Sequence, residues 1–215
     1  MASALVSDLE DFDLNHILQS RQVKVPQAGL QKGGWYFEDK RLTRLRDKIH
    51  DAGIPLKDYC GSPLYGIKTG LNEAFVIDSL TCERLIAQDR RSKEILRPFL
   101  EGKDIQTWHY NWRGLWLIYA YHGIDIEQYP AVLAYLKTYR PALERRATID
   151  SHKWYELQQP QMAYSERYTG VKIIYPHFSR WPKFCLDQKG FFSNDKTYCI
   201  PGEDFYLLAV LLTFA

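Results

Sequence analysis

The stretch from Lys172 to Ile200 constrains the fold of this chain more than any other. Short runs of β-forming residues alternate there with polar, aromatic-rich turns, a pattern typical of strands joined by short loops. Between two of these runs lies His177-Phe178-Ser179-Arg180-Trp181. We expect rigid strands to display this segment as an outward-facing loop. Its cation, hydroxyl and rings are the side-chain types that contact base edges in a DNA groove.

The remaining pattern mixes helices and strands without the alternating order of βαβ units. Helical spacing of apolar residues predicts helices at 35–49, at 81–88 with Thr81 as the cap, and at 131–147, where Pro141 implies a kink or two helices. Strands are expected at 115–119, and at 65–67 and 74–77 as a hairpin around residues 69–72. Residues 154–169 are expected to form a loop, and 172–200 a strand meander. The sequence therefore predicts an α+β fold with a mostly antiparallel sheet, hairpins and several packed helices.

The two ends of the chain differ in pattern. Residues 1–34 are weakly patterned, and the three glycines of 27–34 favour a linker or N-terminal segment. Residues 35–215 are expected to form a single domain. The apolar run Tyr206–Ala215 resembles a core element cut in its middle, so we expect this domain to be incomplete at its C-terminus.

Charge, cysteines and missing motifs exclude several classes of protein. The net charge is only +2, so nucleic-acid binding would require a local basic patch. The 4 cysteines include no C-x-x-C pair, which favours buried thiols over a metal cage. Acidic residues near the start argue against a signal peptide, and no apolar run reaches the ~20 residues of a membrane span. We expect a cytoplasmic protein without membrane contact. Phosphate-binding loops and nucleophile elbows are absent, so no catalytic site is expected in this chain.

Three aromatic and polar segments are candidates for contacting DNA bases. The predicted base contacts are Trp108, His109, Asn111, Arg113, Ser165, Arg167, Ser179, Arg180 and Trp181. In the alternative interpretation, residues 108–113 and 164–168 are aromatic corners of the core with a solvated arginine. Predicted phosphate contacts are Lys68 and Lys103, each close to a glycine, and Arg97; the alternative is a solvated position for each.

Several motifs, in this order, resemble a known family. The segment 65–78, YGIKTGLNEAFVID, is similar to the entry hairpin of the Taq-like specificity domain, and residues 95–105, ILRPFLEGKDI, match the next motif. The Tyr129-Pro130-Ala131 start of a helix, the Trp154–Leu157 segment and the stretch 172–200 complete the series. This domain is the target-recognition module of adenine-specific DNA methyltransferases and of fused type IIG restriction–modification enzymes.

The resemblance implies that DNA recognition and methyl transfer are carried out by separate domains. A separate methyltransferase catalytic domain, in cis or in trans, would bind S-adenosylmethionine and hold the Pro-Pro motif that grips a flipped adenine. This chain has no Pro-Pro pair and would bind no cofactor itself. It would supply sequence-specific recognition of double-stranded DNA. Because base-contacting residues vary with the recognised site, the resemblance identifies loops rather than individual residues.

Two other functions remain open at this point. The aromatic loops could be hot spots of a protein–protein interaction or scaffold module in a phage-defence complex, because Trp, Tyr and Arg dominate such interfaces. A small hydrolase that uses Ser165 or Ser179 with His177 is the third interpretation.

Overall fold

The computed structural model describes residue 27 and residues 39–213. The chain divides into two compact units, residues 1–59 and residues 60–215. The boundary predicted between residues 34 and 35 lies outside the described residues, as does the segment 1–34 apart from Gln27.

The described part of the first unit is helical, which confirms the first predicted helix. Helix α2 (Lys40–Ala52) begins after Asp39, whose carboxylate accepts a hydrogen bond of 2.6 Å from the backbone N–H of Arg41. Residues 35–38 of the prediction lie outside the described part. The short helix α3 (Leu56–Cys60) follows.

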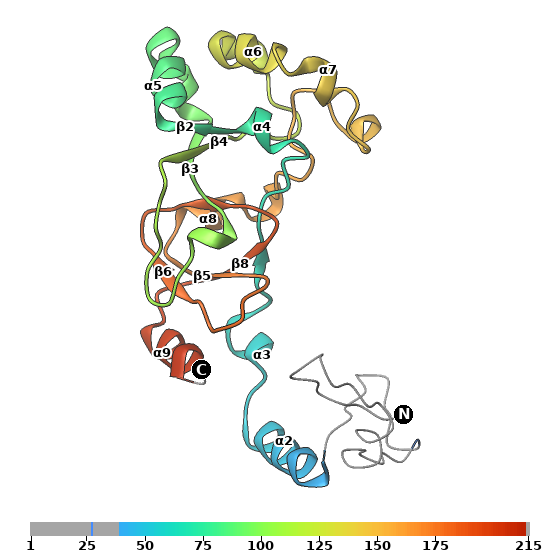
Figure 1. The fold of residues 1–215 in the computed structure, drawn as a ribbon, viewed down its shortest axis with the longest axis vertical. Coiled ribbons are helices and arrows are strands. Elements are labelled where there is room, and N and C mark those ends of the chain that lie inside the picture. Colours follow the sequence, from blue (N-terminus) through green and yellow to red (C-terminus); the bar gives the residue numbers. More distant parts are fainter. Residues whose placement is uncertain (1–26, 28–38, 214–215) are drawn as a thin grey trace, which may run out of the picture. The chain divides into compact units, whose positions relative to one another are not determined.

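Two four-stranded sheets form the second unit (Figure 1). Their strands are β1 (Leu64–Tyr65), β2 (Val76–Asp78), β3 (Leu96–Leu100), β4 (Leu115–Ile118), β5 (Lys172–Pro176), β6 (Cys185–Asp187), β7 (Phe192–Ser193) and β8 (Thr197–Pro201). The first sheet has the order β1-β8-β5-β6 and is antiparallel throughout. The second has the order β2-β4-β3-β7, in which only β3 and β7 are parallel. The predicted α+β class is confirmed.

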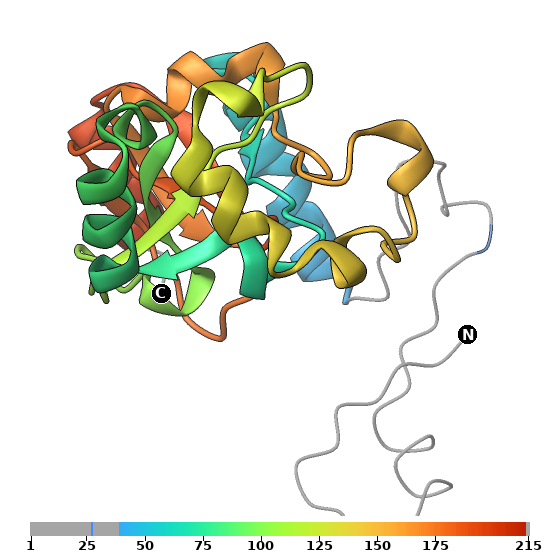
Figure 2. The ribbon, with the colours of Figure 1, turned by 90° about the horizontal axis from the view of Figure 1, so that it is seen from above.

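Short helices connect and cover these sheets. They are α4 (Asn72–Phe75), α5 (Ser79–Gln88), α6 (Pro130–Lys137), α7 (Arg140–Leu143), α8 (Ser165–Thr169) and α9 (Phe205–Thr213), with 3₁₀ turns η2 (Arg90–Glu94), η3 (Gly102–Asp104), η4 (Ile126–Gln128), η5 (Ile149–Ser151) and η6 (Met162–Tyr164). Helices α5 (green) and α6 (yellow) lie side by side in Figure 2.

The structure confirms one detail of the predicted helices and contradicts another. The chain does form two helices around Pro141, since α6 ends before it and α7 contains it in its first turn. The predicted cap of α5 is wrong. Asp78 caps this helix by accepting a hydrogen bond of 2.7 Å from the backbone N–H of Thr81.

The predicted hairpin around residues 69–72 is wrong, because its two runs join different sheets. Tyr65 pairs with Tyr198 in the first sheet, whereas Val76 pairs with Leu117 in the second. Between them the chain crosses the β7–β8 turn so closely that a Cβ on Gly66 would lie 1.8 Å from the carbonyl oxygen of Asn194. Tertiary pairing therefore overrides the local turn pattern.

The predicted meander over 172–200 and the loop over 154–169 need correction as well. Strands β5 and β6 do form a hairpin, but β7 belongs to the second sheet and β8 lies between β1 and β5. The 154–169 segment contains η6 and α8, and the Tyr168 hydroxyl on α8 donates to the Tyr65 carbonyl. Tyr168 is fully buried and thus belongs to the core.

One large core joins the two sheets, and α9 closes a smaller one on the other face of the first sheet. The large core contains a buried ion pair between Lys172 and Asp187. Asp187 also accepts hydrogen bonds of 2.8 Å from the backbone N–H groups of Lys189 and Phe191, and Lys172 donates to the Tyr168 carbonyl. These bonds satisfy both buried charges and fix β5, β6 and the turn before β7 relative to one another.

Candidate nucleic-acid interface

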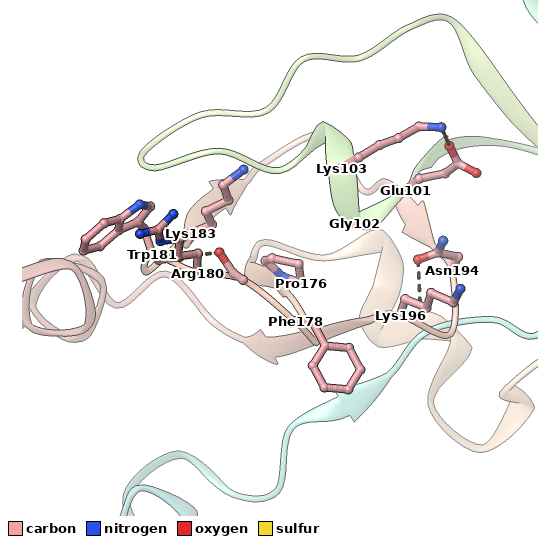
Figure 3. Close-up of a pocket in the computed structure, with 11 residues that line it drawn as sticks. Glu101, Gly102, Lys103, Pro176, Phe178, Arg180, Trp181, Lys183, Asn194 and Lys196 are labelled. Carbon is pink, nitrogen blue, oxygen red and sulfur yellow. Dashed lines mark hydrogen bonds and ion pairs between the residues drawn. The ribbon is translucent and has the colours of Figure 1, made fainter. Parts of the chain in front are cut away.

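A groove of about 610 Å³ lies where three segments of the second unit meet (Figure 3). They are the turn after β3, the β5–β6 loop and the β7–β8 turn. The charged residues that line it are Lys103, Arg180, Lys183, Lys196 and Glu101. Four cations against one carboxylate make this groove a basic site on a chain with little net charge.

The turn after β3 is built around a buried carboxylate. Asp104 accepts a hydrogen bond of 2.8 Å from the backbone N–H of Glu101. Its two oxygens also accept hydrogen bonds from the Arg113 guanidinium, at 2.6 Å from Nε and 3.2 Å from Nη2. The two-pronged contact fixes the turn and the following segment relative to each other.

Glu101 is shared between two cations. Its Oε2 accepts a hydrogen bond from Arg113 and lies 2.8 Å from the Nζ of Lys103. Burial alone would raise the pKa of Glu101, but the hydrogen bonds from Lys103 and Arg113 hold it below its ordinary value. The carboxylate is therefore ionised at neutral pH and holds Lys103 at the groove.

A glycine allows the turn after β3 to approach the β7–β8 turn. A Cβ on Gly102 would lie 3.3 Å from the carbonyl oxygen of Lys196, closer than ordinary packing. The two turns therefore bring Lys103 and Lys196, which are far apart in sequence, to the same groove.

The β5–β6 loop is held at both of its ends. The backbone N–H of His177 donates to the Lys196 carbonyl at 2.8 Å. On the returning side, Thr107 donates its hydroxyl to the Pro182 carbonyl at 3.1 Å, and the Trp108 N–H donates to the Phe184 carbonyl at 3.0 Å. These contacts join the 105–113 segment to the loop, although none of the residues that line the groove lies in that segment.

The structure brings four of the predicted site residues to the groove: Lys103, Ser179, Arg180 and Trp181. The Arg180 guanidinium lies 5.6 Å from the centre of the Trp181 ring, within range of a cation–π contact. Trp181 is exposed, so its ring is available to a ligand.

Four other predicted residues lie on the adjoining 105–113 segment. Trp108 is exposed and has a left-handed backbone (φ 72°), while His109 and Asn111 are also exposed. Arg113 is engaged with Asp104 and Glu101 and would have to leave both to contact a base.

The remaining predicted residues do not line the groove. Ser165 and Arg167 lie on α8, and Lys68 follows β1, where its backbone pairs with Gln159. Arg97 lies on β3 opposite Leu117, and its Nε is buried without a hydrogen-bond partner among the described residues.

Phe178 lies in the loop 177–181 that was expected to face outward, but it was not among the predicted contacts. Sequence reasoning missed four other residues that line the groove: Glu101, Lys183, Asn194 and Lys196. The polar turn Ser193-Asn194-Asp195-Lys196 between two β-forming runs was the available signal for the last two. What the sequence did not show is that this turn packs against the one after β3.

The hydrolase alternative lacks its central contact. Ser165 donates its hydroxyl to the Met162 carbonyl at 3.3 Å, and Ser179 donates its hydroxyl to the Trp181 carbonyl. Neither hydroxyl is therefore directed at His177, which a nucleophile–base pair would require. Over residues 39–213 and residue 27, no three metal-ligating side chains lie together. In the same part of the chain, no helix is both long and apolar enough to cross a membrane.

Comparison with known proteins finds sequence similarity to part of a methyltransferase. No family model matches the sequence. It is 27% identical over 181 residues to the type II methyltransferase M.BanIII of Aneurinibacillus aneurinilyticus, a match that covers 79% of this chain and 29% of that protein. The solved structure of the type IIL restriction-modification enzyme MmeI in complex with DNA matches with a TM-score of 0.49 and 19% identity, over 70% of this chain and 20% of that one.

The chain is thus related in sequence to part of a type II methyltransferase. This relationship confirms the methyltransferase connection expected from the ordered motifs. The chain spans about 29% of the length of that relative.

Proposed function

We propose that this chain belongs to a restriction–modification system and recognises a double-stranded DNA target for an adenine-specific methyltransferase, as a Taq-like specificity domain does. The catalytic domain, which binds S-adenosylmethionine, would be a separate part of the same protein or a partner chain. A fused type IIG enzyme would add a nuclease. The sequence relationship to a type II methyltransferase supports the proposal.

The observation that carries the proposal is the convergence of four cations on one groove. Lys103, Arg180, Lys183 and Lys196 come from three separate segments, and the net charge of the whole chain is only +2. Phosphates would bind to the three lysines, while Arg180, Asn194 and the Trp181 ring can contact base edges. The 105–113 segment extends this surface beyond the groove.

Salt dependence of duplex binding tests the proposal. Counterion release makes the logarithm of affinity fall by about 0.9 per contacted phosphate for each decade of salt. We expect the Lys103→Ala/Lys183→Ala/Lys196→Ala variant to bind more weakly and to lower this slope by about 3. As a matched control, Lys137→Ala/Lys153→Ala removes two cations that do not line the groove and should leave the slope unchanged. The proposal fails if the chain shows no salt-dependent duplex binding, alone or with its methyltransferase domain.

A second groove favours the alternative of a protein-interaction module. It has a volume of about 450 Å³ and lies between η4, α6 and residues 153–155. The Arg140 guanidinium lies 5.1 Å from the centre of the Trp154 ring, and Tyr155 packs edge-on against that ring at 5.4 Å. Trp, Tyr and Arg are the residues that dominate protein interfaces. Tight binding of a phage-defence partner that competitor DNA does not weaken, and that Trp154→Ala abolishes, would support this function.

A further inference from the structure

Phe178 is the most exposed large apolar side chain among the described residues, with 82% of its surface accessible. It lies in the β5–β6 loop and lines the basic groove together with Arg180 and Lys183. Figure 3 shows its ring apart from the other labelled side chains. An exposed phenylalanine gains little from burial in the free protein, and its ring is accessible to a ligand that binds the basic groove.

A series of stacked rings supports Phe178 from behind. The His177 ring lies parallel to it, with centroids 4.2 Å apart and an interplanar angle of 16°. The next ring, Tyr198, packs edge-on against His177 at 5.1 Å and stacks on Tyr175 at 5.6 Å. Tyr175 and Tyr198 are paired neighbours on β5 and β8, so the series ends on the rigid sheet.

The backbone of the loop is fixed as well. The hydrogen bond from the His177 N–H to the Lys196 carbonyl ties its first residue to the β7–β8 turn. The contacts of Thr107 with Pro182 and of Trp108 with Phe184 tie its last residues to the 105–113 segment. A side chain that displaces part of a ligand needs a fixed backbone, because a mobile loop would itself be displaced.

These features match the requirements of a side chain that separates stacked base pairs. Proteins that kink DNA insert apolar side chains such as Phe between base pairs and hold the bent duplex by its phosphates. Phe178 presents an open ring face and no polar atom that would lose a hydrogen bond on insertion. Trp181 is less suited, because Arg180 lies over its ring and its indole N–H needs an acceptor.

We infer that Phe178 enters the DNA duplex as a wedge between two stacked base pairs, with His177 as the positioning residue behind it. The inference rests on the proposed recognition of double-stranded DNA and adds a distortion of the target to it. Lys183 and Lys196 would contact the phosphates that flank the opened step. The groove would therefore recognise deformability of the target in addition to base edges.

The fluorescence of 2-aminopurine, which rises when the base loses its stacking neighbours, tests this inference. The 215-residue chain would first select its preferred duplex from a random pool, and 2-aminopurine would then be placed at successive positions of that duplex. We expect the fluorescence to rise several-fold at one step on binding. Phe178→Ala should abolish most of this rise while it changes duplex affinity by less than about tenfold.

Matched variants separate insertion from a general loss of structure. Phe178→Leu keeps an apolar side chain able to insert and should retain much of the rise, whereas His177→Ala should reduce it. Leu80→Ala removes a side chain that is 76% exposed on α5 and should change nothing. A chain that binds duplex without any rise, or a rise that survives Phe178→Ala, would overturn the wedge alone. Absence of duplex binding would overturn the proposed function and the wedge with it.

Discussion

At the scale of single residues, Arg113 differs from its predicted role. It was predicted to contact a base, yet its guanidinium bonds to the buried Asp104 and to Glu101. Removing it would leave the Asp104 carboxylate, only 3% exposed, without its cation. A buried charge without a partner costs more free energy than an exposed pair contributes.

We therefore expect Arg113→Ala to lower the free energy of unfolding by about 1–3 kcal/mol, measured by urea denaturation. Arg113→Lys should recover part of this loss, because a lysine can pair with one of the two carboxylates. Arg167→Ala, on the exposed face of α8, is the control and should change stability by less than about 0.5 kcal/mol. Unchanged stability combined with altered base preference in Arg113→Ala would instead support direct base contact.

Glu101 gives the stability of the turn after β3 a defined pH dependence. The pKa of Glu101 in the folded chain lies below its ordinary value of 4.5 because Lys103 and Arg113 donate hydrogen bonds to it. A lowered folded-state pKa stabilises the fold above the ordinary pKa, and this contribution is lost as the pH falls through the folded-state value. We expect Glu101→Gln to be less stable than the parent at neutral pH and to show a smaller loss on acidification. Parallel denaturation curves of the two proteins at every pH would contradict this assignment.

Residue chemistry alone identified part of the groove. A cation beside a glycine suggested Lys103, and a cation, a hydroxyl and a ring in one loop suggested Arg180 and Trp181. Lys196 could not be found in this way. It lies 93 positions after Lys103 in the chain, and it reaches the groove only because the β7–β8 turn packs against the turn after β3. The engagement of Arg113 also depends on tertiary structure, since its partner Asp104 is buried only in the folded chain.

At the scale of elements, local patterns were reliable where neighbours in sequence are also neighbours in space. Strand β4 and the two helices around Pro141 follow from apolar spacing and from proline geometry. The predicted hairpin at 65–77 failed because each of its runs pairs with a strand distant in sequence. The residues between the two runs form the segment that crosses the β7–β8 turn and the start of α4. A local sequence pattern does not distinguish such a segment from a hairpin turn.

Gly66 marks this crossing, and its substitution tests it. An added Cβ would lie 1.8 Å from the Asn194 carbonyl oxygen, a backbone atom that cannot move without displacing the β7–β8 turn. We expect Gly66→Ala to destabilise the protein by about 1–3 kcal/mol or more in thermal or urea denaturation. Gly170→Ala is the matched control, because its Cβ would meet only the Arg167 carbonyl oxygen at 3.8 Å, an ordinary contact. A Gly66→Ala variant as stable as Gly170→Ala would show that the two segments do not cross so closely.

At the scale of the whole molecule, the division into two units assigns the candidate function to one of them. Both sheets, the core that joins them and every residue that lines the basic groove belong to residues 60–215. A unit with its own core is expected to fold independently. The buried Lys172–Asp187 pair and its backbone hydrogen bonds also lie within this unit.

We expect a chain of residues 60–215 to unfold cooperatively, with a Tm within about 4 °C of that of the full chain. Because the groove is complete in this fragment, its duplex affinity and salt dependence should also match those of the full chain. Residues 68–215 provide the control, since they lack β1 and with it the Tyr65 carbonyl that accepts hydrogen bonds from Tyr164 and Tyr168. This shorter fragment should be markedly less stable. If the 60–215 fragment instead lost cooperative unfolding, or kept its stability but lost the duplex binding of the full chain, then residues 1–59 would contribute to the fold or to the proposed DNA-binding surface.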